Sequence, residues 1–208
     1  MGNAQRDAFI SAAKNGLVDE LRDLLSKLSR EDKRAGRYYD DAGEKGQSAL
    51  HKAAELGWLP CVQLLIDAGA QKHRLDESGR SPLFLAVDAG RLEVVDYLLK
   101  NGSDPNYTFC AINADKCRAD AEVRRETPLL RAAAKGNLDM VIMLCKSGAD
   151  VNVRVTDGAL FFGTTALMLA ASSNRLEVAR YLLVKADAKV DVVNNDGSSA
   201  LHIAAYAG

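Results

Sequence analysis

The sequence lacks the features of a membrane or secreted protein. No stretch approaches the roughly 18 consecutive apolar residues of a membrane-spanning helix, and the first residues lack the apolar core of a signal peptide. The four cysteines form no C-x-x-C pair and have no histidine at zinc-finger spacing; they are Cys61, Cys110, Cys117 and Cys145. We therefore expect a soluble, cytoplasmic protein with free thiols, no membrane insertion and no metal site.

The sequence also lacks an excess of either charge and any motif of catalysis. Its 27 basic and 28 acidic residues leave a net charge of -1, which gives no attraction to nucleic acid. No phosphate-binding G-x-x-x-x-G-K-[S/T], dinucleotide-binding G-x-G-x-x-G after a strand, metalloprotease H-E-x-x-H or nucleophile G-x-S-x-G is present. We expect no enzyme activity, no catalytic residue and no cofactor.

What the sequence has instead is one phrase written five times. Its pattern is Ser or Thr, then Pro or Ala, then Leu, and the copies begin at Ser48, Ser81, Thr127, Thr165 and Ser199. Their leucines, at 50, 83, 129, 167 and 201, are separated by 33, 46, 38 and 34 residues. A period near 33, lengthened in two connections, predicts a stack of paired helices.

The residues of the copy at 76–106 indicate how each repeat folds. Ser81 is placed to cap a first helix, and Pro82 follows at the first helical position, where its missing N–H costs nothing. This helix is predicted to run from Pro82 to Ala89, and Gly90 ends it in a left-handed conformation. A second amphipathic helix follows and stops at Asn101-Gly102. The predicted unit is helix, tight turn, helix and projecting loop.

This pattern resembles the ankyrin repeat family over nearly the whole chain. The resemblance rests on the repeated phrase, the Ala-Ala-x-x-Gly that ends the first helix, the Leu-Leu pair of the second helix, and Gly-Ala-Asp-Val-Asn at 148–152. It implies an all-α solenoid of stacked helix-turn-helix units with projecting β-hairpin loops. It also implies that His51 and His202 tie neighbouring loops together through hydrogen bonds rather than acting in catalysis.

The repeats predict a single domain over 1–208. Its expected parts are repeat 1 at about 5–40, repeat 2 at 43–75, repeat 3 at 76–108, an insertion at 109–121, repeat 4 at 122–159, repeat 5 at 160–193 and a partial repeat 6 at 194–208. Asp7, Ser11 and Lys14 give repeat 1 the polar outer side of a terminal cap. Leu201 in the last copy would lack a covering layer, so a fragment of a longer protein is expected. In repeat 5, Asn174 replaces the helix-ending glycine, and we expect it to be left-handed.

Two added segments leave alternatives open. Residues 114–123 in the long insertion are either a short surface helix or a tolerated loop. Leu160, Phe161 and Phe162 lie on a hairpin tip, where three adjacent apolar residues are either a recognition hot spot or a plug folded back on the stack.

The family resemblance implies a monomeric scaffold that binds another protein or a peptide along a concave groove. The family's variable contact positions fall on Gln47, Glu55, Leu56, Arg80, Asp88, Ala89, Glu126, Lys135, Thr164, Ser172, Ser173, Ser198 and Tyr206, with Leu160, Phe161 and Phe162 nearby. The alternative is a regulatory or substrate-docking arm of a larger enzyme or channel. Asn106 and Asn152 resemble asparagines that intracellular hydroxylases modify in some ankyrin repeats; the alternative is that they satisfy turn backbone.

Overall fold

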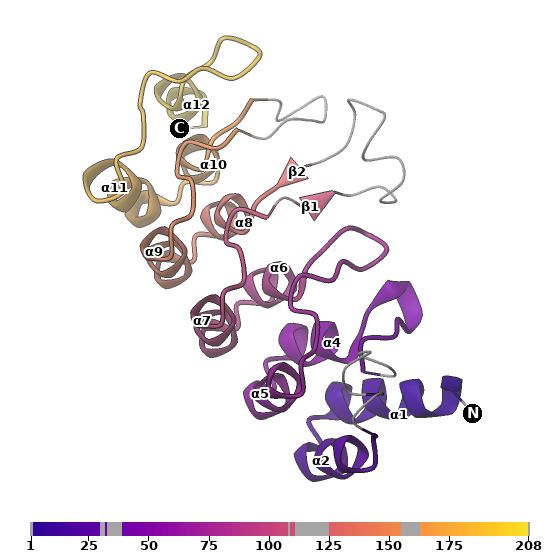
Figure 1. Cartoon of the computed structure of the whole chain (residues 1–208). Helices are drawn as coiled ribbons and strands as arrows, with labels where there is room; N and C mark the ends of the chain where they lie inside the picture. The colour runs from indigo at the N-terminus through magenta and orange to yellow at the C-terminus, as the bar shows by residue number, and fades with distance from the viewer. Residues whose placement is uncertain are drawn as a thin grey trace. The chain divides into compact units, whose positions relative to one another are not determined.

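The computed structural model describes residues 2–29, 32, 39–107, 109–110, 125–154 and 163–207. These residues form two compact units, 1–103 and 104–208, and each unit is a stack of helix pairs (Figure 1). The predicted helix-turn-helix repeat is confirmed in both units.

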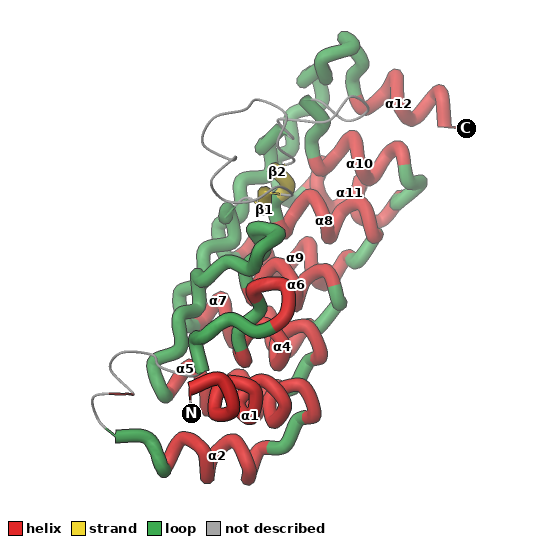
Figure 2. The backbone as a smooth tube through the Cα atoms, turned by 90° about the vertical axis from the view of Figure 1, so that its right-hand side faces the viewer, coloured by secondary structure: helices red, strands yellow, loops and turns green. Residues whose placement is uncertain are grey.

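The first unit contains three helix pairs. The first helices of the pairs are α1 (Gly2–Asn15), α4 (Ala49–Leu56) and α6 (Pro82–Asp88), and they pack in that order. The second helices are α2 (Val18–Ser26), α5 (Leu59–Asp67) and α7 (Leu92–Lys100), which pack in the same order, and a 3-10 turn, η1 (Glu44–Gly46), precedes α4. The loops that precede α4 and α6 lie on the same side of these helices (Figure 2).

The second unit begins with a short antiparallel pair, β1 (Phe109–Cys110) and β2 (Arg125–Glu126). Phe109 lies opposite Glu126, so the two strands flank the segment 111–124. This segment lies outside the described residues, and so does the helix expected at 114–123. The helices that follow are α8 (Pro128–Lys135), α9 (Leu138–Lys146), α10 (Ala166–Ser172), α11 (Leu176–Val184) and α12 (Ala200–Ala207). Here α8, α10 and α12 pack in sequence, and α9 packs on α11.

Side chains predicted to start and stop the helices do so. The Ser81 hydroxyl accepts a hydrogen bond from the Phe84 amide at 3.1 Å, and Thr127 and Thr165 cap α8 and α10 in the same way. Helix α6 ends at Asp88, one residue earlier than expected, because Ala89 already serves as its C-cap. Asn174 has a φ of 53°, which confirms the left-handed conformation expected where the other repeats use glycine.

The core of each unit is built from the leucines of the repeated phrase. Leu50 and Leu83 are at most 1% exposed, and in the second unit Leu129 and Leu167 are at most 4% exposed. The alanines that follow them are also buried, and their small size allows neighbouring first helices to approach closely. Leu201, at the same position of α12, is 77% exposed. Packing of one repeat on the next therefore decides whether this leucine is buried.

The polar side chains predicted on the outer side of repeat 1 are exposed, and the structure places two of the four cysteines. Asp7, Ser11 and Lys14 are exposed on α1, as a cap-like helix requires. Cys61 is buried in α5 and Cys145 is half-buried in α9; burial raises the pKa of both thiols, that of Cys145 to about 11. Cys110 and Cys117 lie where the structure describes no side chains.

Candidate protein-interaction surface

The loops before the first helices share one hairpin geometry. In the first unit, the amides of Gly43 and Asp76 each donate to the carbonyl four residues later, at 3.0 Å in both cases. In the second unit, the Asn194 amide donates to the Ser198 carbonyl at 2.9 Å. We call the three segments 43–47, 76–80 and 194–198 the hairpin tips. Each tip leads directly into the capped start of a first helix.

In two of the three tips, the side chain of the first residue accepts hydrogen bonds from backbone amides of the same turn. The Asp76 Oδ1 atom accepts from the amides of Ser78 and Arg80 at 2.9 and 2.8 Å, and Asn194 uses its Oδ1 atom in the same way. Gly43 has no side chain to contribute, since a Cβ there would lie 2.5 Å from the Cδ1 atom of Ile10 on α1. A side chain at this position would therefore require the end of the Ile10 side chain to move.

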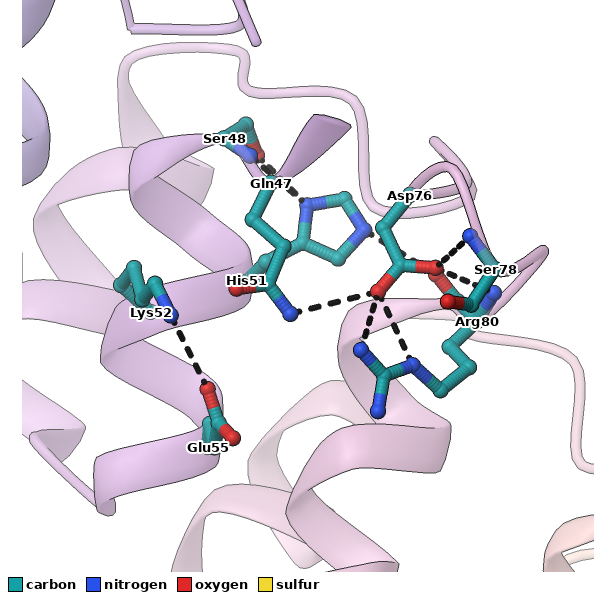
Figure 3. A network of polar contacts seen from close by, with 8 residues as sticks. All are labelled: Gln47, Ser48, His51, Lys52, Glu55, Asp76, Ser78 and Arg80. Carbon is teal, nitrogen blue, oxygen red and sulfur yellow. Dashed lines mark hydrogen bonds and ion pairs between the residues drawn. The ribbon is translucent and has the colours of Figure 1, made fainter. Parts of the chain in front are cut away.

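His51 connects two successive repeats, as the family resemblance implies. Its Nδ1 atom lies 3.1 Å from the Ser48 amide nitrogen and 2.9 Å from the Ser48 hydroxyl, while Nε2 lies 3.2 Å from the Arg80 carbonyl (Figure 3). An amide can only donate and a carbonyl can only accept, so Nδ1 is the acceptor and Nε2 carries the proton. Burial lowers the pKa of His51 from 6.5 to about 4, against the opposing effect of the Asp76 carboxylate.

The group of Ser48, His51 and Asp76 is a structural network rather than a catalytic triad. Ser48 and His51 are both 0% exposed. His51 directs Nδ1 at Ser48 and Nε2 at the Arg80 carbonyl, whereas in a catalytic triad Nε2 faces the serine and Nδ1 faces a carboxylate. No substrate can reach the Ser48 hydroxyl in this arrangement. Within the part of the chain that the structure describes, there is also no cluster of three potential metal ligands.

Asp76 is the centre of the network, and this corrects the expectation for Gln47. The Asp76 Oδ2 atom accepts from Gln47 Nε2 at 3.2 Å and from Arg80 Nε at 2.9 Å, and it lies 2.8 Å from Arg80 Nη2 (Figure 3). Gln47 is only 2% exposed, so it does not lie on an open surface as predicted. A buried carboxylate needs donors, and the sequence offers them at these two hairpin positions. The half-buried Arg80 is directed at Asp76 for the same reason.

The equivalent hairpin positions of the second unit are also engaged within the chain. Glu126 forms an ion pair with Arg131, with 2.8 Å between Oε2 and Nη2. Thr164 is 4% exposed, which corrects its predicted place on the surface. The adjacent turn is covered by Arg154, which donates to the carbonyls of Gly163 and Val193. Ser198 is half-buried.

The predicted contact positions that are open to solvent lie at the C-terminal ends of the first helices. Leu56 on α4, Lys135 on α8 and Ser172 on α10 are exposed, and Tyr206 on α12 is 96% exposed. The half-buried positions are Glu55, Asp88, Ala89 and Ser173. Leu160, Phe161 and Phe162 lie outside the described residues.

The two asparagines compared with hydroxylation sites connect successive turns. Asn106 donates through Nδ2 to the Gly148 carbonyl at 2.9 Å and accepts through Oδ1 from the Asp150 amide at 2.7 Å. Asn152 Oδ1 likewise accepts from the Lys189 amide at 2.9 Å. Their own turns are closed by Asp104 and Asp150 instead. Both side chains therefore satisfy the backbone of the following repeat.

The residue that follows the helix-ending glycine forms a second connection between repeats, which the sequence analysis missed. Trp58 Nε1 donates to the Lys14 carbonyl at 3.0 Å, and Arg91 Nε donates to the Glu55 carbonyl at 3.2 Å. In the second unit, Arg175 Nε lies 3.5 Å from the carbonyl of Ala134. Each side chain satisfies a carbonyl at the end of the preceding first helix. The sequence signal is a large donor side chain directly after glycine or its asparagine substitute.

A groove in the first unit is a further feature that the sequence did not indicate. It lies between α1, the first hairpin tip and α4, has a volume of about 540 Å³, and is lined mainly by polar side chains that include Lys14, Glu44, Gln47 and Lys52. Ile10 is its one large apolar lining residue. We call this cavity the α1 groove. Its polar lining suits a polar ligand more than an apolar one.

None of the described helices has the length and apolar character needed to cross a membrane.

Comparison with known families agrees with the repeat structure. A family model described as ankyrin repeats in three copies matches residues 8–109 and 152–208, and one described as ankyrin repeats in many copies matches 84–145.

The proteins with similar sequences include three that match different shares of this chain. The Homo sapiens protein phosphatase 1 regulatory subunit 27 is 41% identical over 63 residues, which are 30% of this chain and 41% of that protein. Ankyrin repeat and SOCS box protein 3 of Homo sapiens is 35% identical over 100 residues, or 47% of this chain and 18% of that protein. The Xenopus laevis Notch-regulated ankyrin repeat-containing protein is 32% identical over 99 residues, 48% of this chain and 82% of that protein.

The chain thus spans less than half the length of the first two relatives, and most of the third. The first family match covers more than half of the chain, and the second covers most of the α8 and α9 pair that lies between its two segments. The chain therefore belongs to the ankyrin repeat family.

Proposed function

We propose that this chain is a non-catalytic protein-interaction scaffold that binds a peptide or protein segment. In each of the two units, the proposed binding surface consists of that unit's hairpin tips together with the exposed C-terminal ends of its first helices, and we call it the interaction face of that unit. The proposal depends on a contrast in exposure between the side chains that connect repeats and those at the ends of the first helices. Ser48 and His51 are buried in connecting repeats, whereas Leu56, Lys135 and Ser172 at the helix ends remain open to solvent.

The exposed side chains of these faces suit a partner that presents both apolar and polar groups. The face of the first unit has an exposed apolar side chain at Leu56, and the face of the second unit has the exposed polar side chains of Lys135 and Ser172. Protein interfaces combine such apolar and polar groups, and binding energy comes from a few of them. Protein binding is also the role that the ankyrin repeats of the relatives imply, since one of them is named a regulatory subunit.

Paired charge reversals test the proposal. A peptide selected on the intact chain from a phage-displayed random library is the probe, and isothermal titration calorimetry measures its Kd. Lys135→Glu on the interaction face of the second unit is compared with Lys146→Glu, an exposed lysine of α9. In the first unit, Glu55→Arg is compared with Glu93→Arg on α7.

The proposal expects at least one face variant to weaken the peptide roughly tenfold, while both second-helix controls bind as the wild type does. Failure to select any peptide, or equal losses in the controls, would refute it. Circular dichroism of all four variants shows whether the helices are retained.

The regulatory or docking-arm alternative is favoured by the lengths of the relatives. The matched segment is 18% of ankyrin repeat and SOCS box protein 3, so repeats of this type occur as parts of larger proteins. The coding sequence adjoining these residues distinguishes the two proposals. A catalytic or channel domain encoded beside the repeats supports the docking arm, and further repeats ending in a polar cap oppose it.

A further inference from the structure

The exposed apolar side chains of the first unit gather at one place. Within the part of this unit that the structure describes, the large apolar side chains that are exposed are Leu17, Leu56 and Trp58, at 45%, 37% and 43%. All three lie at the tight turns that join the first and second helices of repeats 1 and 2. Exposed apolar side chains that are scattered singly need no explanation, whereas gathered ones mark an interaction site.

Contacts between the two repeats join these side chains into one surface. The Trp58 indole lies over Gly16, since a Cβ there would be 2.7 Å from the Cδ2 atom of the ring, and Leu17 is the next residue. The ring is held in this position because Nε1 donates to the Lys14 carbonyl at 3.0 Å. Leu56 is the last residue of α4, two positions before Trp58. We call Leu17, Leu56 and Trp58 the turn patch.

Folding does not require apolar side chains at two of these positions. Leu17 and Trp58 each follow a helix-ending glycine. Later repeats have polar residues at the equivalent position, which are Arg91, Asn137 and Arg175. Arg91 makes the same kind of connection as Trp58, because its Nε atom donates to the Glu55 carbonyl at 3.2 Å. A polar side chain therefore serves the stack as well, and the exposed indole and leucine have another role.

A cation lies at one end of the turn patch. The stem of Arg91 lies over Gly57, where a Cβ would be 2.8 Å from its Cδ atom, so the guanidinium group is beside the end of α4. Arg91 is exposed and forms no ion pair within the described residues. Glu55, the carboxylate at this helix end, is paired with Lys52 at 3.4 Å. The guanidinium group is therefore available to a carboxylate of a partner.

This combination favours one class of partner. Tryptophan and arginine are the residues that most often contribute binding energy at protein interfaces, and an apolar side chain can be buried against the indole and the leucines. A carboxylate close to it pairs with Arg91 through charge-assisted hydrogen bonds. An anionic lipid surface fits less well, because a planar membrane would also meet the exposed carboxylates of Glu20 and Glu93 in the first turns of α2 and α7.

We propose that the turn patch and Arg91 bind a short acidic segment of a partner protein, which presents an apolar side chain within a few residues of a carboxylate. The apolar side chain lies against Trp58 and the two leucines, and the carboxylate pairs with Arg91. This inference rests on the proposed function and deepens it, because it states the partner chemistry for the interaction face of the first unit.

The fluorescence of Trp58, the only tryptophan of the sequence, reports binding at the turn patch directly. The probes are peptides selected on the intact chain from a phage-displayed random library that contains no tryptophan. Each peptide is titrated while Trp58 emission is recorded, and calorimetry measures its Kd. We expect a subset of the peptides to shift the emission to shorter wavelength, because they bury the indole. These peptides should carry an aromatic or aliphatic residue close to an aspartate or glutamate.

Matched variants distinguish contact with the peptide from packing of the repeats. Leu17→Ser should weaken this subset roughly tenfold, whereas Leu183→Ser on α11, at a leucine that is 42% exposed, should leave the Kd unchanged. Arg91→Glu should weaken the subset roughly two- to fivefold. Its control is Arg175→Glu, because Arg175 holds the same position in the second unit and lies 3.5 Å from its own carbonyl acceptor.

A charge exchange completes the test. A peptide in which lysine replaces the acidic residue should bind Arg91→Glu more tightly than the wild type, and a loss caused by packing alone would not be rescued in this way. Three results overturn the inference: no selected peptide changes Trp58 emission, Arg91→Glu and Arg175→Glu have equal effects, or vesicles of phosphatidylcholine and phosphatidylserine in equal parts shift the emission as strongly as the peptides do.

The same measurements distinguish failure of this inference from failure of the proposed function. If Trp58 emission never changes while Lys135→Glu weakens a selected peptide, the scaffold function stands without the turn patch. If no peptide is selected at all, both proposals fail.

Discussion

His51 is predicted to make the stability of the protein depend on pH between neutrality and pH 4. Its folded pKa of about 4 lies below the ordinary value of 6.5, because the ring is 0% exposed and burial disfavours the imidazolium. Protonation would also place a hydrogen on Nδ1, which must accept from the Ser48 amide at 3.1 Å. A lowered histidine pKa means that the unfolded state binds the proton first, so the stabilisation is complete above pH 6.5 and is lost as the pH falls through about 4.

The magnitude follows from the two pKa values. One pKa unit corresponds to about 1.4 kcal/mol, so a decrease from 6.5 to about 4 amounts to about 3 kcal/mol of unfolding free energy. In His51→Gln this contribution is absent. The difference in unfolding free energy between the wild type and His51→Gln should therefore decrease by about 3 kcal/mol between pH 7 and pH 4. Carboxylates that titrate over the same range are present in both proteins and cancel in the difference.

Urea unfolding at a series of pH values measures this difference. Trp58 is the only tryptophan of the sequence and belongs to the same unit as His51, so its fluorescence reports the relevant transition. His202→Gln is the control, since His202 holds the same place in the phrase and the same contact with its serine but is exposed. A wild-type minus His51→Gln difference that stays constant from pH 7 to pH 4 would refute the assignment of a buried, neutral ring.

Three further predictions concern a turn, a cap and a thiol. Gly46→Ala should destabilise the chain by more than about 2 kcal/mol in urea unfolding, because Gly46 has a φ of +71° and a Cβ there would lie 2.6 Å from the Glu77 backbone nitrogen. Gly69→Ala, with a φ of +94° and no atom closer than 3.9 Å, should cost only about 1–2 kcal/mol; equal losses would contradict the steric argument. Ser81→Ala should lower the unfolding free energy by about 1 kcal/mol through loss of the α6 cap, and an unchanged midpoint would show that the cap contributes nothing. Cys145, with a pKa of about 11, has about 3 thiolates in 10,000 at pH 7.5, so N-ethylmaleimide should label it slowly until urea is added; mass spectrometry of its peptide would detect rapid labelling, which would contradict the burial.

The local structure of the repeats could be predicted from the sequence because it depends on neighbouring residues. A serine or threonine three residues before a free amide caps the helix whatever lies around it, as Ser81 does. Asn174 was expected to be left-handed because asparagine, with its short polar side chain, adopts this conformation more readily than most residues other than glycine. A connection from His51 to a neighbouring loop was also expected, although only through the resemblance to a known family, and the structure identifies the Arg80 carbonyl as its partner.

The candidate site was predicted less well, because exposure depends on what packs against a residue. Gln47 and Thr164 occupy positions that the family resemblance marks as variable contacts, yet both are buried. Gln47 donates to Asp76 in a buried network, and Thr164 is 4% exposed. The donors Trp58 and Arg91 were not recognised, because their acceptors are carbonyls of the preceding repeat, 44 and 36 residues away.

The sequence by itself therefore determined the repeat, its helix pairs, their caps and turns, and the family to which the chain belongs. These features repeat at one period, and each arises from side chains acting on backbone a few residues away. Only the tertiary structure decided which polar groups are buried in networks within the chain and which are exposed. The buried Asp76 carboxylate takes its donors from two hairpin tips, and packing of α1 against the first tip creates the α1 groove. Such partnerships form between residues about 30 positions apart, where only the folded chain brings donor and acceptor together.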